Sequence, residues 1–238
     1  MSAYIRDLFL TLSGCDKGRL SDQGFLYGML AQSPQELSMQ TCIPPRVFNS
    51  GETLFGAVGL MTSHLAVATK PSKNVAFVSL SSCGEFDPEK ATRYFSGAFS
   101  PSSYGRLFKQ CKIPGREWEV VLDDYHADRT PRVDREYKDH PTHSSDMGRT
   151  IRETLPIKTG GRRVDADIST FKFDPHGETA IAVLPESLVF RHTWPEHGFS
   201  HAQICYLNLP VSEGEQISVE RVLQQWFDRS AQGITAVA

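Results

Sequence analysis

Short apolar runs alternate with polar turn segments along the first half of the chain, a pattern that predicts β-strands. The runs are residues 8–12, 54–69 and 75–82. Residues 70–74, which separate the last two, include a proline and an asparagine, and both residue types favour turns. The pattern therefore predicts an antiparallel hairpin. A turn centred on Lys73 would place Ser63 opposite Cys83, with their Cβ atoms about 5 Å apart.

Three segments carry the apolar spacing of helices. Residues 21–30 place apolar side chains on one side, and residues 218–229 do the same near the end of the chain. Asp87 and Pro88 provide an N-cap and a proline at the first helical position, which predicts a helix running to about residue 99.

The second half repeats this order. We expect a strand at 117–122, a hairpin around 194–198 and then the last helix, while residues 123–168 are polar and partly predict a mobile loop. Strand, helix, hairpin and helix, given twice, predict an α+β fold of antiparallel sheets with helices on one face. The predicted domains are residues 1–115 and 116–238, with the polar loop at about 125–165.

The two halves also share an internal similarity in sequence. Stretches 48–83 and 171–205 can be laid over each other with an offset of 124 residues. The offset pairs Ser63 with Ser187, Thr69 with Thr193, and Pro71 with Pro195.

Four segments of these stretches carry a recognisable motif. Residues 192–196 read HTWPE, 173–179 read FDPHGET, 62–64 read TSH, and 83–95 begin with a cysteine and continue as GEFDPEKATRYF. Together they resemble the pyruvoyl-dependent S-adenosylmethionine decarboxylases, with both repeats fused in one chain. The resemblance implies two tandem β-α-β-β-α-β-type repeats that form an αββα layer sandwich.

Decarboxylation of an amino acid leaves a carbanion at Cα, so an electron sink is needed. In the family this sink is a covalent pyruvoyl group, whose ketone forms a Schiff base with the substrate amine. The group forms when a serine hydroxyl attacks the preceding carbonyl and the resulting ester undergoes elimination. That chemistry needs a base and a donor that holds the oxyanion.

The resemblance implies that the chain is cleaved between Thr62 and Ser63, and that Ser63 becomes the pyruvoyl group. Cys83 would then donate a proton to the carbanion. Thr179 and His192, from the second half, would assist self-processing.

The substrate contacts implied by the resemblance come from both halves. Glu196 would bind the ribose hydroxyls, Phe173 would stack on adenine, and His176 belongs to the same upstream motif. Leu12 occupies the position at which the family has an aromatic residue against the adenine.

A second site built on Ser187 would lack most of its parts. Its cysteine position is Leu207, and the first half would supply Ala68 and Ser72 in place of histidine and glutamate. Only Glu186 before the serine matches the family. We therefore expect one active site, at Ser63.

Composition is compatible with this interpretation. A net charge of −3 without basic runs does not favour nucleic-acid binding. Five cysteines without a C-x-x-C spacing favour reduced thiols, and no segment has the length of a membrane span. The histidine spacing fits no tight pair of zinc ligands, so no metal is expected. We expect a cytoplasmic monomer or homodimer that acts on S-adenosylmethionine for polyamine synthesis.

Two alternatives remain open. Leu12 in place of an aromatic residue is compatible with a pyruvoyl decarboxylase of a basic amino acid such as ornithine or arginine. Thr62, at a position where the family usually has glutamate, is compatible with a non-processing paralogue that binds and regulates an active decarboxylase.

Overall fold

The computed structural model describes residues 3–50, 53–113, 118–123, 132–137, 158–159, 162–163, 167–172, 177–184, 187–194 and 199–206. The chain divides into two compact units after Thr130. Each unit is built on an antiparallel sheet, and a separate two-stranded ladder pairs β9 (Lys158–Thr159) with β10 (Arg162–Arg163). With its few helices, the chain has the predicted α+β fold. Within the described ranges, no helix is both long and apolar enough to span a membrane.

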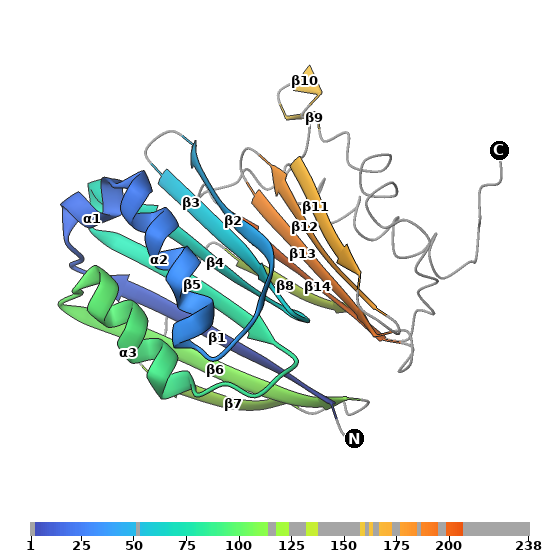
Figure 1. The fold of residues 1–238 in the computed structure, drawn as a ribbon. Helices are drawn as coiled ribbons and strands as arrows, with labels where there is room; N and C mark the ends of the chain where they lie inside the picture. Colours follow the sequence, from blue (N-terminus) through green and yellow to red (C-terminus); the bar gives the residue numbers. More distant parts are fainter. Residues whose placement is uncertain are drawn as a thin grey trace. The chain divides into compact units, whose positions relative to one another are not determined.

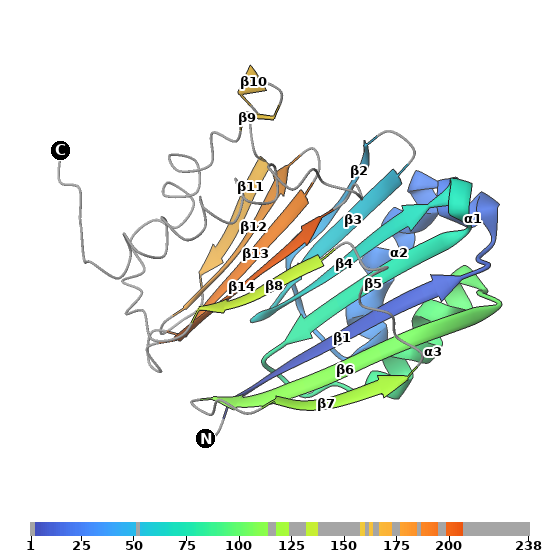
Figure 2. The same ribbon diagram turned by 180° about the vertical axis from the view of Figure 1, so that it is seen from behind.

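The first unit has a seven-stranded sheet in the order β2-β3-β4-β5-β1-β6-β7 (Figures 1 and 2). Its strands are β1 (Ala3–Ser13), β2 (Thr41–Ser50), β3 (Thr53–Leu60), β4 (Ser63–Lys70), β5 (Val75–Ser82), β6 (Ser103–Ile113) and β7 (Trp118–Asp123). The strands predicted at 8–12 and 75–82 are confirmed. The apolar run 54–69 is two strands rather than one, because the chain reverses at Met61 and Thr62.

Three helices cover one face of this sheet: α1 (Lys17–Ser21), α2 (Gln23–Glu36) and α3 (Pro88–Phe99) (Figure 1). Leu8, Leu10 and Leu12 alternate along β1 and are buried in the core beneath the helices. Helix α2 approaches β3 so closely that a Cβ atom at Gly56 would lie 2.2 Å from Leu30 Cδ1. A side chain at position 56 would therefore force the helix away from the sheet.

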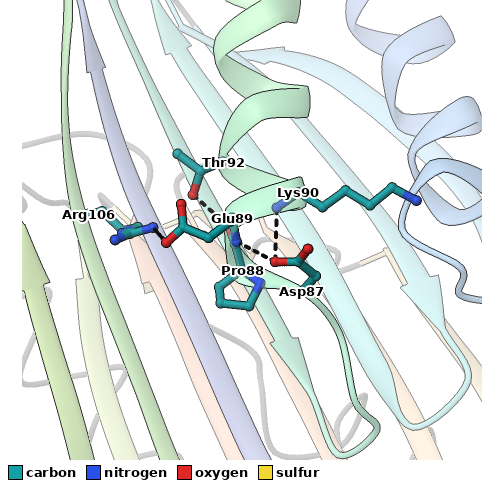
Figure 3. Close-up of polar contacts among 6 residues, drawn as sticks. All are labelled: Asp87, Pro88, Glu89, Lys90, Thr92 and Arg106. Atoms are coloured by element: carbon teal, nitrogen blue, oxygen red, sulfur yellow. Dashed lines mark hydrogen bonds and ion pairs between the residues drawn. The ribbon is translucent and has the colours of Figure 1, made fainter.

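Helix α3 begins where the sequence predicts (Figure 3). The Asp87 carboxylate accepts hydrogen bonds from the backbone N–H groups of Glu89 at 2.9 Å and Lys90 at 3.1 Å, which satisfies two donors of the first turn. Glu89 forms an ion pair with Arg106 of β6. The start of the helix is thus fixed both to its own cap and to the sheet.

The β4–β5 hairpin is confirmed, but its predicted register is wrong by one residue. Lys70 pairs with Val75, and Ser63 pairs with Ser82 rather than with Cys83. The reason lies in the connection, a 3-10 turn (Pro71–Lys73) followed by Asn74 in the left-handed conformation with φ 53°. These four residues place the centre of the turn between residues 72 and 73, whereas the prediction placed it on Lys73.

The second unit has a five-stranded sheet in the order β11-β12-β13-β14-β8 (Figure 2). Its strands are β8 (Arg132–Tyr137), β11 (Asp167–Lys172), β12 (Glu178–Leu184), β13 (Ser187–Trp194) and β14 (Phe199–Tyr206). The predicted pairing of the two strands that flank 195–198 is confirmed. The helix predicted at 218–229 lies outside the described residues.

The offset of 124 residues relates the two sheets strand by strand. Adding 124 to the bounds of β4 and β5 gives the bounds of β13 and β14. The registers agree as well, because Ser63 pairs with Ser82 in one sheet and Ser187 with Tyr206 in the other. Strands β3, β4, β5 and β1 are adjacent in this order in the first sheet, as β12, β13, β14 and β8 are in the second. The internal similarity in sequence is therefore matched in sheet topology.

This correspondence corrects the predicted start of the second repeat. The strand predicted at 117–122 exists as β7, but it pairs with β6 at the edge of the first sheet. The strand that occupies the place of β1 is β8, which lies inside the region interpreted as a polar loop. The loop interpretation is wrong for residues 132–137, which form a strand that pairs with β14. These residues are mostly charged, so no apolar run indicated a strand.

Candidate active site

Ser63 is the first residue of β4, and its side chain is buried, with 2% of its surface exposed. It lies on the helix-covered face of the sheet, since Leu65 and Val67 follow it at alternate positions and belong to the core. Its hydroxyl lies 2.9 Å from the hydroxyl of Ser82 across the strand pair. The predicted nucleophile is thus held in a dry site by one polar partner.

Thr62, the residue before the predicted cleavage point, has a strained backbone. It lies in the two-residue turn between Leu60 and Ser63 and has a φ of 55°. A β-branched residue rarely adopts this left-handed conformation, which costs roughly 1–3 kcal/mol and is common at functional sites. The strain lies next to the Thr62–Ser63 peptide bond.

Cys83 lies across from Thr62, not from Ser63. Its backbone N–H donates to the Thr62 carbonyl oxygen at 3.4 Å, and its thiol contacts the Thr62 hydroxyl. The predicted cross-strand pair of Ser63 and Cys83 is therefore corrected to Thr62 and Cys83. The half-buried thiol remains beside the predicted cleavage point.

The segment that follows Cys83 is tied to the first strand. The Gly84 N–H donates to the Ser82 hydroxyl at 3.0 Å, and Arg6 Nη1 of β1 donates to the Gly84 carbonyl at 3.2 Å. Arg6 also forms an ion pair with Glu85 at 3.4 Å. Together with the capped helix α3 that follows, these contacts limit the movement of Cys83.

The side chain of His64 occupies the opposite face of β4 from Ser63. It is fully buried and pairs in register with Ser81, which in turn pairs with Asp7 of β1. The buried Asp7 carboxylate forms an ion pair with Lys109 Nζ at 3.4 Å on this face. Although His64 follows Ser63 in sequence, strand alternation separates their side chains.

Two other cysteines of the described part have a different environment from Cys83. Burial raises the pKa of the Cys15 thiol to about 11, although a backbone hydrogen bond opposes the shift. Burial also raises the pKa of the Cys42 thiol to about 11. Both thiols therefore stay protonated near neutral pH. In the described part of the chain, Cys15, Cys42 and Cys83 form no disulfide bond.

Thr179 and His192, the two residues expected to assist self-processing, form a polar pair in the second unit. They face each other on β12 and β13, and Thr179 Oγ1 lies 2.8 Å from His192 Nδ1. Both side chains are buried, with 0% and 2% of their surface exposed. The hydrogen bond fixes the orientation of the imidazole ring in a site with little water.

Of the four residues predicted to contact the substrate, the structure describes only Leu12. Phe173, His176 and Glu196 lie outside the described residues. Leu12 is fully buried in the core, at the far end of the strands from Ser63. Six residues along a strand separate the two positions, or about 20 Å. The structure does not bring Leu12 to Ser63.

Ser82 was missed by the sequence reasoning. It carries no motif of its own, and only the corrected register places it opposite Ser63. Among the described residues, no group of three or more His, Cys, Asp or Glu is placed to hold a metal ion.

A model of the family "S-adenosylmethionine decarboxylase" matches residues 6–107 and 149–225. The match extends over more than half of the chain and through both units, and the chain belongs to the S-adenosylmethionine decarboxylase family.

Several curated proteins named S-adenosylmethionine decarboxylase proenzyme are similar to short parts of the chain. The protein of Aquifex aeolicus is 44% identical over 34 residues, which is 14% of this chain and 25% of that protein. The protein of Methanococcus aeolicus is 51% identical over 37 residues, 16% of this chain and 32% of that protein. The protein of Prochlorococcus marinus is 37% identical over 51 residues, 20% of this chain and 41% of that protein. The chain thus spans between 25% and 41% of the length of these three relatives.

Among solved structures, the crystal structure of the adenosylmethionine decarboxylase from Aquifex aeolicus aligns with a TM-score of 0.39 and 19% sequence identity. The alignment covers 44% of this chain and 88% of that chain.

Proposed function

We propose that the protein is a self-processing, pyruvoyl-dependent decarboxylase of S-adenosylmethionine. The proposal rests mainly on the environment of Ser63, taken together with the membership of the chain in this family. A buried serine hydroxyl, held by one partner, directly follows a residue with strained backbone. Family membership and the relatives' name, which includes "proenzyme", support the same chemistry.

The residues present fit conversion of Ser63 into the pyruvoyl group. The reaction needs a serine hydroxyl beside its own preceding carbonyl, and the strain at Thr62 favours rearrangement of that peptide bond. The low exposure of Ser63 and Ser82 keeps water from hydrolysing the intermediate ester. When formed, the group supplies an electron sink for decarboxylation.

We assign the remaining roles to residues of both units. The half-buried Cys83 donates the proton that replaces the lost carboxylate, since a thiol beside the cleavage point can transfer a proton near neutral pH. Thr179 orients His192, and His192 acts as the base during self-processing. Glu196 and Phe173 bind the ribose and the adenine. The product would serve as the aminopropyl donor of polyamine synthesis.

Intact mass tests the proposal in one measurement. After incubation at neutral pH, the protein should give two chains, the first ending at Thr62 and the second beginning with a pyruvoyl group in place of Ser63. Ser63→Ala should give one uncleaved chain. If the unaltered protein also stays uncleaved, the proposal is wrong.

The same measurement decides the second candidate, a non-processing paralogue that regulates an active decarboxylase. The observation in its favour is Thr62, whose hydroxyl is already bonded to the Met61 carbonyl at 2.7 Å and provides no carboxylate at this position. A single chain that binds an active decarboxylase and changes its turnover would support this candidate.

A further inference from the structure

The Ser82 hydroxyl joins two groups of the candidate site. It lies 2.9 Å from the Ser63 hydroxyl and accepts a hydrogen bond from the Gly84 N–H at 3.0 Å. Its side chain is 3% exposed, so neither contact competes with bulk water. The three groups form a short chain of hydrogen bonds that ends at the predicted nucleophile.

The direction of this chain follows from the donors. A backbone N–H can only donate, so Ser82 Oγ uses one lone pair for Gly84. A hydroxyl that accepts a hydrogen bond becomes a stronger donor, because successive hydrogen bonds polarise one another. In the uncleaved chain Ser82 Oγ accepts from both the Gly84 N–H and the Ser63 O–H. Once Ser63 has lost its hydroxyl proton to form the ester, Ser63 Oγ can only accept, and the Ser82 O–H can donate to it.

We propose that Ser82 is a catalytic residue of self-processing, which holds Ser63 Oγ for attack and stabilises the charge that later develops on this oxygen. The inference deepens the function proposed above and rests on it. It concerns a residue that directly precedes Cys83 and whose side chain contacts the reacting atom itself.

The order in which bonds form and break during self-processing shows at which step Ser82 acts. Ser63 Oγ attacks the Thr62 carbonyl carbon, the C–N bond to Ser63 breaks, and the hydroxyl proton passes to the freed amine. The base then removes the Ser63 Hα, the Cβ–Oγ bond breaks, and its electron pair leaves with the Thr62 carboxylate. Water hydrolyses the remaining enamine, through its imine, to the ketone and ammonia. Negative charge on Oγ develops as the Cβ–Oγ bond breaks, where the Ser82 donor stabilises it.

The second repeat offers an internal contrast. The residue opposite Ser187 is Tyr206, at the position that corresponds to Ser82. Tyrosine carries its hydroxyl at the far end of an aromatic ring, so it cannot replace a serine hydroxyl directly opposite. Position 206 of the second repeat therefore has no short hydroxyl side chain of the kind that Ser82 has in the first.

Cleavage of chains made by cell-free synthesis tests the inference, because each chain starts uncleaved. In Ser82→Ala, the first-order rate of cleavage should fall by about 10- to 100-fold, the range for losing a donor to a charged oxygen. Ser82→Thr keeps the hydroxyl and should retain most of the rate. Ser82→Cys keeps the size but donates weakly, so it should be slow even if Ser82→Ala disturbs folding.

Ser81→Ala is the matched control, since Ser81 is equally buried on the same strand but faces the other side. Its rate should match the unaltered chain. Hydroxylamine, which cleaves esters but not peptide bonds, should release more product from Ser82→Ala, because the ester accumulates when elimination is slowed. If Ser82→Ala and Ser82→Cys cleave at the normal rate, only the inference fails. If the unaltered chain does not cleave, the proposed function fails with it.

Discussion

Hairpin β4–β5 of the first unit and hairpin β13–β14 of the second have corresponding bounds and the same register, yet they hold different polar side chains. The first has Ser63 opposite Ser82. The adjoining strand pair of the second unit has Thr179 opposite His192, where the first unit has Phe55 opposite Ala68. A duplicated backbone thus carries two complementary sets of groups.

The largest effect should be on cleavage of the chain, which we expect to depend on Ser63 and not on Ser187. Ser63→Ala should abolish cleavage, since no other hydroxyl in the first hairpin directly follows the strained Thr62. Ser187→Ala should leave cleavage intact, because Tyr206 and Leu207 replace the residues that correspond to Ser82 and Cys83. Gel electrophoresis and intact mass measure both outcomes. If Ser187→Ala blocks cleavage and Ser63→Ala does not, the active hairpin is the second one.

The next largest effect should come from Cys83. In Cys83→Ala we expect cleavage to persist while turnover of S-adenosylmethionine falls by about 10²–10⁴-fold, the usual contribution of a general acid. Release of CO₂ from carboxyl-labelled substrate measures this rate.

Cys42→Ala is the control for this variant, because Cys42 is also a partly exposed thiol of the first unit. Its pKa of about 11 leaves it protonated, and its thiolate fraction stays small at pH 8. Iodoacetamide at this pH should therefore spare Cys42. Turnover at the normal rate in Cys83→Ala would exclude the proton-donor role.

A smaller effect should follow loss of the Thr179 hydroxyl. Thr179→Val keeps the shape but removes the hydrogen bond to His192 Nδ1, so cleavage should slow by about 3- to 10-fold. Thr179→Ser should restore the rate. Equal half-lives of the uncleaved chain in the Val and Ser variants would show that the hydrogen bond has no part in processing.

The smallest effect should be a change in the free energy of unfolding when Asn74 is replaced, because Asn74 ends the turn that sets the register of the first hairpin. Asn74→Ala, made in the Ser63→Ala background, should lower the free energy of unfolding by about 1 kcal/mol, because alanine tolerates the left-handed conformation poorly. Asn74→Gly should be nearly neutral, and glycine is the residue at the corresponding position 198. Urea unfolding measures the difference. A loss in the glycine variant as large as in the alanine variant would argue against a backbone effect.

Local sequence signals predicted the β4–β5 hairpin and helix α3 of the first unit, but not strands β2 and β6. Asp87 and Pro88 marked the start of α3 because capping depends on adjacent residues. The register of the hairpin depends on whether its turn has an odd or even number of residues, and the sequence did not show that the 3-10 turn and Asn74 close it in four. A turn of four residues places Ser63 opposite Ser82, whereas a turn with an odd number of residues, centred on Lys73, would have placed it opposite Cys83.

Strand β8 was missed for a different reason. Its residues are mostly charged, so no apolar run marks it, and only its pairing with β14 defines it as a strand. Leu12 shows the same dependence on tertiary structure. The resemblance placed it at the substrate, whereas packing beneath the helices places it in the core.

The order of strands in the first sheet has a consequence for the two chains that cleavage would produce. A cut between Thr62 and Ser63 leaves β1, β2 and β3 on one chain and β4 to β7 on the other. In the sheet, however, β1 lies between β5 and β6 and pairs with both along most of its length. The products are therefore interleaved and stay joined without any covalent link. Their native mass should remain that of one particle, and refolding after denaturation should depend on concentration, because an intramolecular fold has become a bimolecular assembly.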